Sequence, residues 1–513
     1  MAQRTDTINP GGRFAAVPAL LAGAVVVLLT LGTLLAVALR ADVGSGLGAA
    51  DWAAIRFTVS QALVSATVSV LLAVPVARAL ARRRFRGRAV LITLLGAPFI
   101  LPVIVAVLGL LAVFGRSGVL NTAMTALGLP ELSIYGFHGV VLAHVFFNLP
   151  LATRFLLQGW LAIPAERFRL AASLNAPVGR ILEWPMLRAV VPGAFLVIFV
   201  ICLTSFAVAL TLGGGPGATT VELAIYESLR FDFDPGRAAL LGCIQFGLCA
   251  ATALVAWQVS AVDGFGAGLD RVVQRWDGSA VLDGLWITCA ALFLLVPLAM
   301  VLVQGVAGLT ELPAEVWPSI GRSVGVAIAS AALTGVLALA LALKGGRLVA
   351  VIGVLPLAAS SLVIGTGLFI MVFPFIRPAD VALPVTAVVN ATLALPFALR
   401  AISPAVATVK HDYGRLAAQL NITGWAWVRL VVLPRVRAPL GFALGLAAAL
   451  SMGDLGVIAL FADQDAATLP LTMYRLMNSY RMEAAAGAGL LLVAISLMLF
   501  WVFDRGGRIN ADV

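Results

Sequence analysis

One ionisable residue lies inside an apolar stretch of the chain. Asp454 stands between Gly453 and Gly456, with apolar residues on both sides. A charge at membrane depth costs roughly 2.5–3.5 kcal/mol on insertion scales, so a carboxylate there is a candidate for function. Asp454 either lines a path for a solute or accepts a hydrogen bond from a serine or threonine of a neighbouring helix. The sequence leaves both possibilities open.

Other polar side chains occur in similar surroundings. His144, Asn148 and Asn390 fall in apolar stretches, where polar residues more often form hydrogen bonds between helices than bind a ligand. Ser205 and Ser451 occupy corresponding positions in the two halves of the sequence. Together with Asp454, these five residues are the candidates for a substrate pathway.

The residues that metal and nucleotide sites require are scattered. The three histidines, His138, His144 and His411, are far apart, and the four cysteines show no metal spacing and no disulfide framework. A phosphate-binding loop needs Gly-x-x-x-x-Gly-Lys followed by Ser or Thr. Glycine follows Lys344 and histidine follows Lys410, so neither lysine fits. We therefore expect no catalytic residue, no metal and no cofactor bound by this chain.

Composition predicts the elements that must position these residues. Hydrophobic residues make up 61% of the 513 positions and charged residues only 11%, against about 25% in a soluble domain. Apolar runs of about 20 residues match the thickness of a bilayer, which predicts an all-α membrane protein of about twelve transmembrane helices. The predicted spans are 17–39, 57–80, 89–113, 138–160, 190–212, 238–259, 282–306, 324–343, 348–373, 383–401, 440–461 and 484–503.

The distribution of basic residues predicts the orientation. Most of the 34 lysines and arginines fall on one side of the predicted spans, and the richest loop runs from Arg78 to Arg88. Basic residues are retained on the cytoplasmic side, so both termini of this multi-pass protein are expected in the cytoplasm. The net charge of +10 is explained by contact with the lipid bilayer and requires no nucleic acid.

The sequence contains an internal repeat. His144 to Arg154 matches Asn390 to Arg400, Leu170 to Asn175 matches Leu416 to Asn421, and Ser205 matches Ser451, always 246 residues apart. Each half has an even number of spans, so the halves share one orientation and relate by an axis along the membrane normal. The predicted organisation is a cytoplasmic N-terminus (1–16), a first half (17–259), a cytoplasmic linker (260–281), a second half (282–503) and a cytoplasmic tail (504–513).

Two long cytoplasmic loops repeat one design. Each is predicted to contain a helix, a turn at an asparagine, a second short helix and a proline that ends it, at Pro185 or Pro434. Asparagine accepts the left-handed conformation that ends a helix. Paired alanines let another backbone approach closely, so these helices are candidates for docking a partner protein, with an ordinary solvated loop as the alternative. The candidate residues are Arg169, Leu170, Ala171, Ala172 and Asn175 in the first loop, and Arg415, Leu416, Ala417, Ala418 and Asn421 in the second.

These loops resemble the EAA loop of ABC importer permeases, although both lack its glutamate and carry asparagine where glycine is usual. Further segments are similar to fused thiamine and thiamine-pyrophosphate ABC transporter permeases: 143–150, 212–216, 219–226 and 451–456. The resemblance covers most of the chain. In the first loop Pro185 follows Asn175 by ten residues, whereas Pro434 follows Asn421 by thirteen, a difference of about one helical turn.

The resemblance implies a fold, partners and a substrate. It implies two tandem six-helix halves of the type I ABC importer permease, with the loops as coupling helices that bind two copies of an ATP-binding subunit. It also implies a place in the bacterial inner membrane, a periplasmic thiamine-binding protein that delivers thiamine or its phosphates, and ATP bound on the partner subunit. Asp454 would then favour passage of a cationic thiazolium ring. The outside loop 213–217 suggests a gate or a contact with the binding protein, and 221–229 suggests a short re-entrant or interfacial helix.

Two alternatives remain. A ferric-iron ABC importer permease shares the architecture of the thiamine permeases. A proton-coupled secondary transporter also often has twelve spans, but such carriers commonly have their longest cytoplasmic loop between the halves. Here the middle segment, 260–281, is shorter than the two repeated loops.

Overall fold

The computed structural model describes residues 12–44, 46–95, 101–213, 215–258 and 279–508. Within these residues every regular element is a helix and no strand occurs, which confirms the predicted all-α class. Most of the linker predicted at 260–281, most of the N-terminus predicted at 1–16, part of the tail predicted at 504–513 and Gly214 of the predicted outside loop lie outside the described residues. The chain forms two compact units, each of which combines segments from distant parts of the sequence.

The first unit comprises the described residues of 1–44, 225–246 and 312–513. Its α-helices are α1 (Gly12–Val27), α2 (Thr33–Arg40), α14 (Val316–Lys344), α15 (Arg347–Val354), α16 (Ser361–Val372), α17 (Ala382–Gln419), α18 (Gly424–Trp427), α19 (Leu433–Met452), α20 (Gly456–Phe461), α21 (Leu469–Asn478) and α22 (Met482–Arg508). Two π-helical turns, η1 (Leu28–Gly32) and η8 (Val428–Val432), and two 3₁₀ turns, η6 (Leu355–Ala358) and η7 (Pro378–Val381), connect them.

The second unit comprises the described residues of 45–224 and 247–311. Its α-helices are α3 (Ala49–Arg82), α4 (Arg88–Leu94), α5 (Val103–Phe114), α6 (Val119–Ala126), α7 (Phe137–Ala162), α8 (Ala165–Ser173), α9 (Trp184–Leu203), α10 (Ala207–Leu212) and α13 (Ala280–Gly308). The π-helical turn η3 (Gly179–Glu183) and the 3₁₀ turns η4 (Pro216–Ala218) and η5 (Leu309–Glu311) complete it. Helices α11 (Val221–Arg230) and α12 (Pro235–Gln258) contribute residues to both units.

The number of spans agrees with the sequence. Eleven helical segments of the described residues are long and apolar enough to cross a membrane, and Ser361–Val372 is a shorter apolar helix. The predicted spans 89–113 and 348–373 are each interrupted, the second by a 3₁₀ turn that contains Pro356. Proline lacks the N–H that continues a helix, which explains the second break. These segments together account for about twelve membrane helices.

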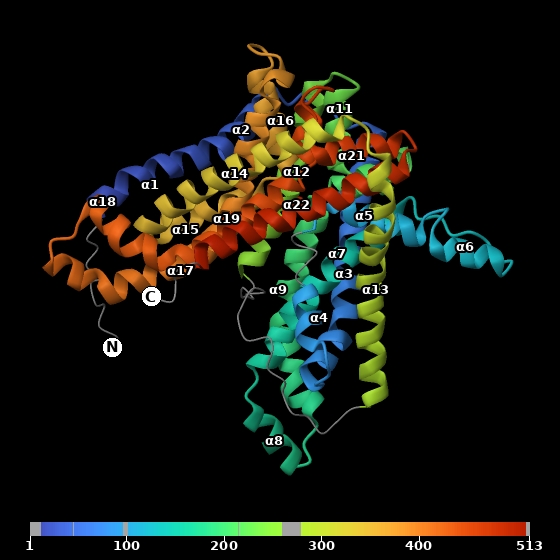
Figure 1. The fold of residues 1–513 in the computed structure, drawn as a ribbon, viewed down its shortest axis with the longest axis horizontal. Coiled ribbons are helices and arrows are strands. Elements are labelled where there is room, and N and C mark those ends of the chain that lie inside the picture. Colours follow the sequence, from blue (N-terminus) through green and yellow to red (C-terminus); the bar gives the residue numbers. More distant parts are fainter. Residues whose placement is uncertain (1–11, 45, 96–100, 214, 259–278, 509–513) are drawn as a thin grey trace. The chain divides into compact units, whose positions relative to one another are not determined.

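The first helix of each half packs in an unexpected place. In the first unit α1 packs on α14, and α2 packs on α16 (Figure 1). In the second unit α13 packs on α3 and α5. The leading helix of each half in sequence therefore belongs to the unit built mainly from the other half. The tandem halves 17–259 and 282–503 stay a prediction about the repeat, because each compact unit draws on both of them.

Two corresponding glycines allow this exchange of helices. A Cβ on Gly367 of α16 would lie 2.5 Å from the carbonyl oxygen of Thr33 in α2. A Cβ on Gly109 of α5 would lie 2.6 Å from the carbonyl oxygen of Pro297 in α13. Each distance is far below van der Waals contact, so only glycine lets these backbones approach so closely.

The two units share further details. The backbone N–H of Val221, at the start of α11, donates to the Thr58 hydroxyl over 2.8 Å. The N–H of Leu469, at the start of α21, donates to the Ser323 hydroxyl over 2.7 Å. In each unit a hydroxyl from a long helix thus satisfies a free donor of a short helix. The helix expected over 221–229 is present as α11.

Candidate functional site

The first candidate loop turns at Asn175. Helix α8 follows Pro164 and ends in a turn where the N–H of Ala176 donates to Ala171 over 2.8 Å and that of Asn175 donates to Ala172 over 3.2 Å. Asn175 has φ of +49°, the left-handed conformation expected from the sequence. These hydrogen bonds satisfy carbonyl groups that would otherwise lack a donor at the end of the helix, and the turn reverses the chain direction.

The second loop makes the same turn with the same pair of hydrogen bonds. The N–H of Ile422 donates to Ala417 over 2.8 Å and that of Asn421 donates to Ala418 over 3.2 Å, with φ of +54° at Asn421. Both loops therefore have the same backbone geometry at positions 246 residues apart in sequence. The repeat predicts such a match, and the two turns agree in their hydrogen bonds and in φ.

The exposed face of each loop is defined more narrowly than the sequence predicts. Ala171 and Ala417 are buried against their own unit, whereas Ala172 and Ala418 are exposed. The exposed face also carries a leucine pair one helical turn apart in each loop. The exposed residues are Arg169, Leu170, Ala172 and Leu174 in the first loop, and Arg415, Leu416, Ala418 and Leu420 in the second. Leu174 and Leu420 were not among the predicted residues, although their spacing of four from Leu170 and Leu416 is visible in the sequence.

The loops differ in how they leave the membrane helix. Helix α7 ends at Ala162 and α8 begins at Ala165, whereas α17 continues without a break to Gln419. Pro164 explains the first break, because proline disfavours the helical conformation of the residue before it. Lys410 occupies the corresponding position of the second half and allows α17 to continue.

The second short helix of each loop does not end at its proline. In the second loop α18, η8 and α19 run on without interruption past Pro434, so the predicted helix end is wrong. The wider π-helical turn before the proline accommodates a residue without an N–H. In the first loop η3 leads directly into α9 past Pro185. No counterpart of α18 precedes η3, which locates the helical turn missing from the shorter first loop.

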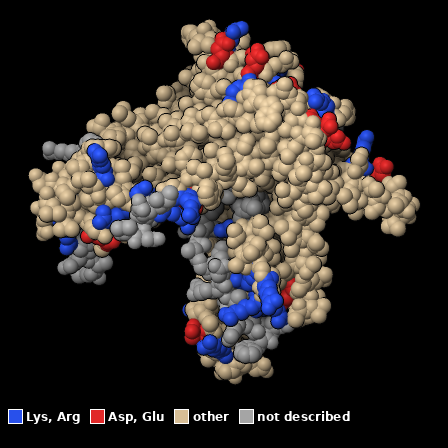
Figure 2. Space-filling model, in the orientation of Figure 1, with Lys and Arg blue, Asp and Glu red and all other residues tan. Residues whose placement is uncertain are grey.

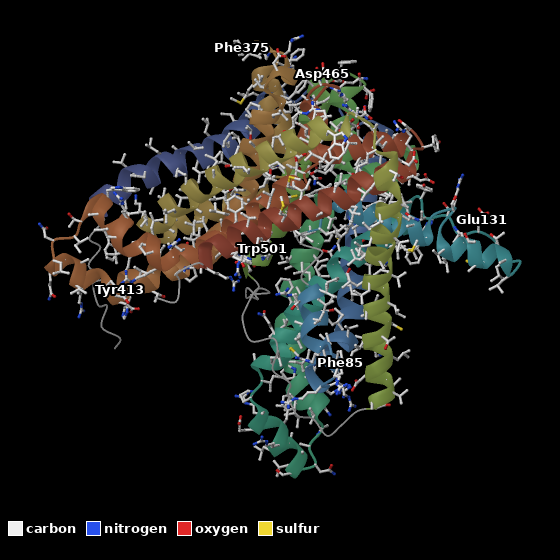
Figure 3. The ribbon with its side chains drawn as sticks, in the orientation of Figure 1. Phe85, Glu131, Phe375, Tyr413, Asp465 and Trp501 are labelled. Carbon is white, nitrogen blue, oxygen red and sulfur yellow. The ribbon has the colours of Figure 1, made fainter. Side chains whose placement is uncertain are left out.

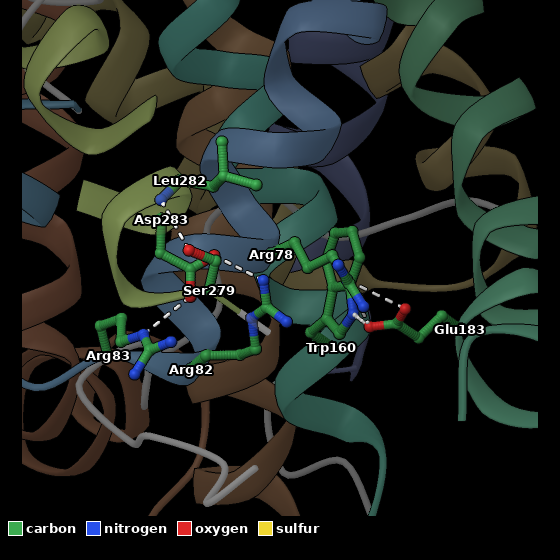
Figure 4. A network of polar contacts seen from close by, with 8 residues as sticks. All are labelled: Arg78, Arg82, Arg83, Trp160, Glu183, Ser279, Leu282 and Asp283. Atoms are coloured by element: carbon green, nitrogen blue, oxygen red, sulfur yellow. Dashed lines mark hydrogen bonds and ion pairs between the residues drawn. The ribbon is translucent and has the colours of Figure 1, made fainter. Parts of the chain in front are cut away.

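A buried carboxylate holds the first loop to the membrane helices. Glu183 of η3 accepts hydrogen bonds from Arg78 Nε over 2.9 and 3.0 Å and from Trp160 Nε1 over 3.1 Å (Figure 4). Glu183 is 5% exposed and Trp160 is fully buried. Three elements thus meet at one side chain: the end of α3, the end of α7 and the exit of the loop.

A second carboxylate lies near the same helix end. Asp283, in the first turn of α13, pairs with Arg82 over 2.5 Å and with Arg83 over 2.7 Å. Figure 2 shows basic side chains gathered at the end of this unit, and Figure 4 shows both arginines around Asp283. Glu183 and Asp283 were not among the predicted residues. The nearest signal in the sequence is the excess of arginine in 78–88, since opposite charges attract at short range.

Other contacts hold the second loop. The guanidinium of Arg435 lies 3.9 Å from the ring centroid of Tyr413, near the end of α17 (Figure 3). Lys410 Nζ donates to the carbonyl oxygen of Leu343 over 2.5 Å at the end of α14. Val432 occupies the position in η8 that corresponds to Glu183, so the buried carboxylate belongs to the first loop alone.

Three of the candidate pathway residues lie together in the first unit. Asn390 of α17 donates to the Ser451 hydroxyl of α19 over 3.0 Å, and its amide lies beside the carboxylate of Asp454. Asp454 occupies the break between α19 and α20, where Oδ1 accepts from the N–H of Gly456 over 3.3 Å. Its Oδ2 is buried without a hydrogen-bond partner among the described residues.

The other three pathway candidates lie in the second unit. Asn148 donates to the carbonyl oxygen of His144 over 2.8 Å and approaches Cys202 Sγ at 3.4 Å. The Ser65 hydroxyl lies 3.4 Å from Nδ1 of His144. Ser205 is partly exposed in the break between α9 and α10. The breaks at 204–206 and 453–455 lie 249 residues apart, because the first loop is three residues shorter than the second. Ser205 therefore corresponds to Asp454 and not to Ser451, so the predicted match of the two serines is wrong. Broken helices often form binding sites in transporters, and both units have one at this place.

No group of three or more metal-ligating side chains occurs in the part of the chain that the structure describes. The fold and these features define a class of protein. The chain is helical, has about twelve apolar segments that can span a membrane, and carries polar clusters at broken helices and two matched loops. These features are those of a multi-pass membrane permease.

Comparison with known proteins defines the family. The chain is 38% identical to the thiamine transport system permease protein of Salmonella typhimurium over 98% of both proteins. It is 38% identical to that of Brucella abortus over 98% of this chain and 97% of the relative, and to that of Escherichia coli over 90% of each. No family model matches the chain. This chain belongs to the family of thiamine transport system permease proteins.

Proposed function

We propose that this chain is the transmembrane subunit of an ATP-driven importer that passes thiamine or its phosphates from a periplasmic binding protein to the cytoplasm. The named relatives support thiamine as the substrate and give no support to the ferric-iron alternative. The observation that carries the coupling role is the pair of matched loops, which have the same turn at Asn175 and Asn421 and the same exposed face.

Energy comes from a separate subunit in this proposal. Each loop docks one copy of an ATP-binding subunit, so a single chain binds two copies and itself binds no cofactor. The exposed leucines and alanines of the loops fill apolar recesses on the partner, and Arg169 and Arg415 pair with acids at the rim. Because ATP is cytoplasmic, both loops and therefore both termini face the cytoplasm.

Substitution of the exposed alanines tests docking directly. The chain is co-expressed with its candidate ATP-binding subunit and purified, and the bound subunit is quantified. Ala172→Trp and Ala418→Trp fill the space that the partner's backbone approaches, so each releases about one of the two copies. Ala126→Trp, at an exposed position on α6 far along the chain from both loops, is the matched control and retains both copies. Full retention in both loop variants would refute docking at these helices.

Uptake by the reconstituted complex tests the substrate and the energy source. Vesicles that contain the chain, the ATP-binding subunit and the binding protein accumulate labelled thiamine only when ATP is supplied on the side of the loops. Uptake by the chain alone, driven by a proton gradient, would instead favour a secondary transporter.

A further inference from the structure

A cavity of about 570 Å³ opens among helix ends in the first unit. The ends of α2, α16 and α20 form it together with α11 and η7, all on the side that the charge pattern predicts to be outside. None of the pathway candidates lines this cavity. Its lining combines three arginines with a set of phenylalanines: Arg40, Arg230, Arg377, Phe233, Phe369, Phe373 and Phe461.

The arginines of this cavity are only partly neutralised. The guanidinium of Arg40 makes no hydrogen bond or ion pair with the residues that the structure describes. Arg230 donates to the carbonyl oxygen of Ala462 over 3.0 Å, which satisfies one N–H and leaves its charge. Arg377 pairs with Asp380 over 2.9 Å. The cavity therefore keeps two arginines whose charges have no carboxylate partner.

The acidic residue that lines the cavity, Asp463, keeps its charge, but its carboxylate accepts hydrogen bonds from the backbone and not from an arginine. Asp463 Oδ1 accepts from the N–H groups of Asp465 and Ala466, each over 3.1 Å. Nearby, Arg475 donates to the carbonyl oxygen of Asp463 over 3.0 Å. Burial, and then the adjacent charge of Arg230, lower the pKa of the Arg475 guanidinium, whereas the nearby acids Glu315 and Asp463 raise it. Arg230 and Arg475 therefore lie close enough to repel each other, and an anion between them would relieve that repulsion.

An aromatic wall faces the arginines. Phe369 stacks on Phe373 with ring centroids 5.6 Å apart, and its edge contacts Phe461 at the same distance. Phe461 is buried, whereas Phe373 is 63% exposed and Phe233 is 81% exposed. Phe375, at the same end of α16, is also exposed (Figure 3). Such a wall offers apolar contact to a flat ring or a hydrocarbon chain.

We propose that this cavity is a binding site for an organic phosphate, with the phosphate held by Arg40 and Arg230 and the organic part against Phe369 and Phe373. A guanidinium presents paired donors that match phosphate oxygens. Two sources carry this chemistry. One is phosphorylated thiamine, which rests on the proposed function, and the other is a phospholipid headgroup at the membrane surface. Free thiamine, which is a cation without a phosphate, is not retained here.

The test measures binding to the full chain without ATP or partners. The chain is placed in nanodiscs of phosphatidylcholine and titrated with thiamine diphosphate, free thiamine and inorganic pyrophosphate. A second arm adds phosphatidylglycerol and counts retained lipids by native mass spectrometry. The variants are Arg40→Gln and Phe373→Ala. Arg322→Gln is the control, because Arg322 is a half-buried arginine of the same unit that does not line the cavity, and its side chain donates to the carbonyl oxygen of Pro318 in its own helix.

We expect Arg40→Gln to weaken the phosphate ligand about tenfold or more, the effect of one lost hydrogen bond to a charged group. Phe373→Ala weakens thiamine diphosphate but leaves pyrophosphate unchanged, and Arg322→Gln changes neither. If Arg40→Gln weakens the binding of thiamine diphosphate, the substrate is the source of the phosphate. If Arg40→Gln lowers only the number of retained phosphatidylglycerol molecules, the source is lipid. If neither ligand binds, or if Arg40→Gln binds both as tightly as the original chain, the proposal is wrong. Failure of ATP-driven thiamine uptake with this binding intact would count against the proposed function alone.

Discussion

At the scale of single residues, Glu183 is the contact that joins the first loop to two membrane helices. Its carboxylate accepts from Arg78 and Trp160, and little of it reaches solvent. A buried donor that loses its acceptor costs about 1–3 kcal/mol, more for a charged group. The side chain therefore fixes the position of η3, through which any movement of α8 reaches α9.

Glu183→Ala leaves Trp160 Nε1 without an acceptor and Arg78 without its ion pair. We expect a loss of about 2 kcal/mol in stability and a lower ratio of thiamine imported to ATP hydrolysed, with ATP-binding subunits still attached. Thermal unfolding and paired uptake and hydrolysis assays measure this. Glu166→Ala, an exposed acid at the start of α8, is the control. An unchanged import ratio would mean that Glu183 serves folding only.

Asp454 offers a sharper separation of roles, because asparagine caps a helix as well as aspartate does. Asp454→Asn keeps the acceptor for the Gly456 N–H and the contact with Asn390 but removes the charge. If the carboxylate favours a cationic ring in transit, thiamine uptake falls about tenfold, the effect of roughly 1.4 kcal/mol. Initial rates of thiamine uptake by reconstituted vesicles distinguish the two roles. Rates equal to those of the original chain would show that Asp454 only caps the helix.

The residue scale also shows what sequence could and could not predict. The turns at Asn175 and Asn421 were predictable because few residues accept positive φ. The cluster of Asn390, Ser451 and Asp454 was predictable only as a set of candidates. The His144 and Asn148 pair lies in a different unit from that cluster, and no local pattern distinguishes the two groups. Partners such as Glu183 and Arg78 are more than a hundred residues apart, beyond the reach of periodicity.

At the scale of elements, the length of the apolar runs predicted where the membrane helices lie but did not predict where they are interrupted. Helix α19 ends at Met452 and α20 begins at Gly456 within a single predicted span, and α9 and α10 divide another in the same way. Neither break contains a proline. Small polar residues such as Thr204, Ser205 and Asp454 occupy them, a weak signal that hydropathy averages away.

The close packing of α2 on α16 and of α13 on α5 depends on two glycines. Substituting either glycine should therefore lower the stability of the chain, whereas substituting a glycine in open space should raise it. Gly109→Ala and Gly367→Ala place a methyl group against a backbone carbonyl that cannot move aside, at a cost of about 1–3 kcal/mol. Gly325→Ala, within α14 and with no atom near its Cβ, gains up to about 1 kcal/mol of helix propensity. Thermal unfolding in detergent compares the three. Equal midpoints for Gly325→Ala and Gly367→Ala would show that α2 does not pack tightly on α16.

At the scale of the whole molecule, the two compact units cut across the order of the sequence. The repeat predicts two equivalent halves, yet each unit takes its leading helix from the other half. Sequence order could not predict this, because a helix followed by a long enough connection can pack on either neighbour. Packing of α1 on α14 and of α13 on α5 makes each half necessary for the other. A chain divided at the linker would therefore expose the apolar faces of both leading helices.

The arginines predict the orientation of the whole chain, and this prediction is open to a direct measurement. A variant with serine at all four cysteines receives a single cysteine, either in place of Glu131, exposed beyond α6 (Figure 3), or in place of Ala172 on the exposed face of α8. We expect Glu131→Cys to react with a membrane-impermeant maleimide in cells whose outer membrane has been made permeable, because the charge pattern predicts that 119–136 lies outside. Ala172→Cys reacts only after the inner membrane is opened, and reacts less when the ATP-binding subunit covers it. Labelling of Ala172→Cys in closed cells would place the loops away from ATP and remove the physical basis for coupling, since no force from hydrolysis could then reach α8.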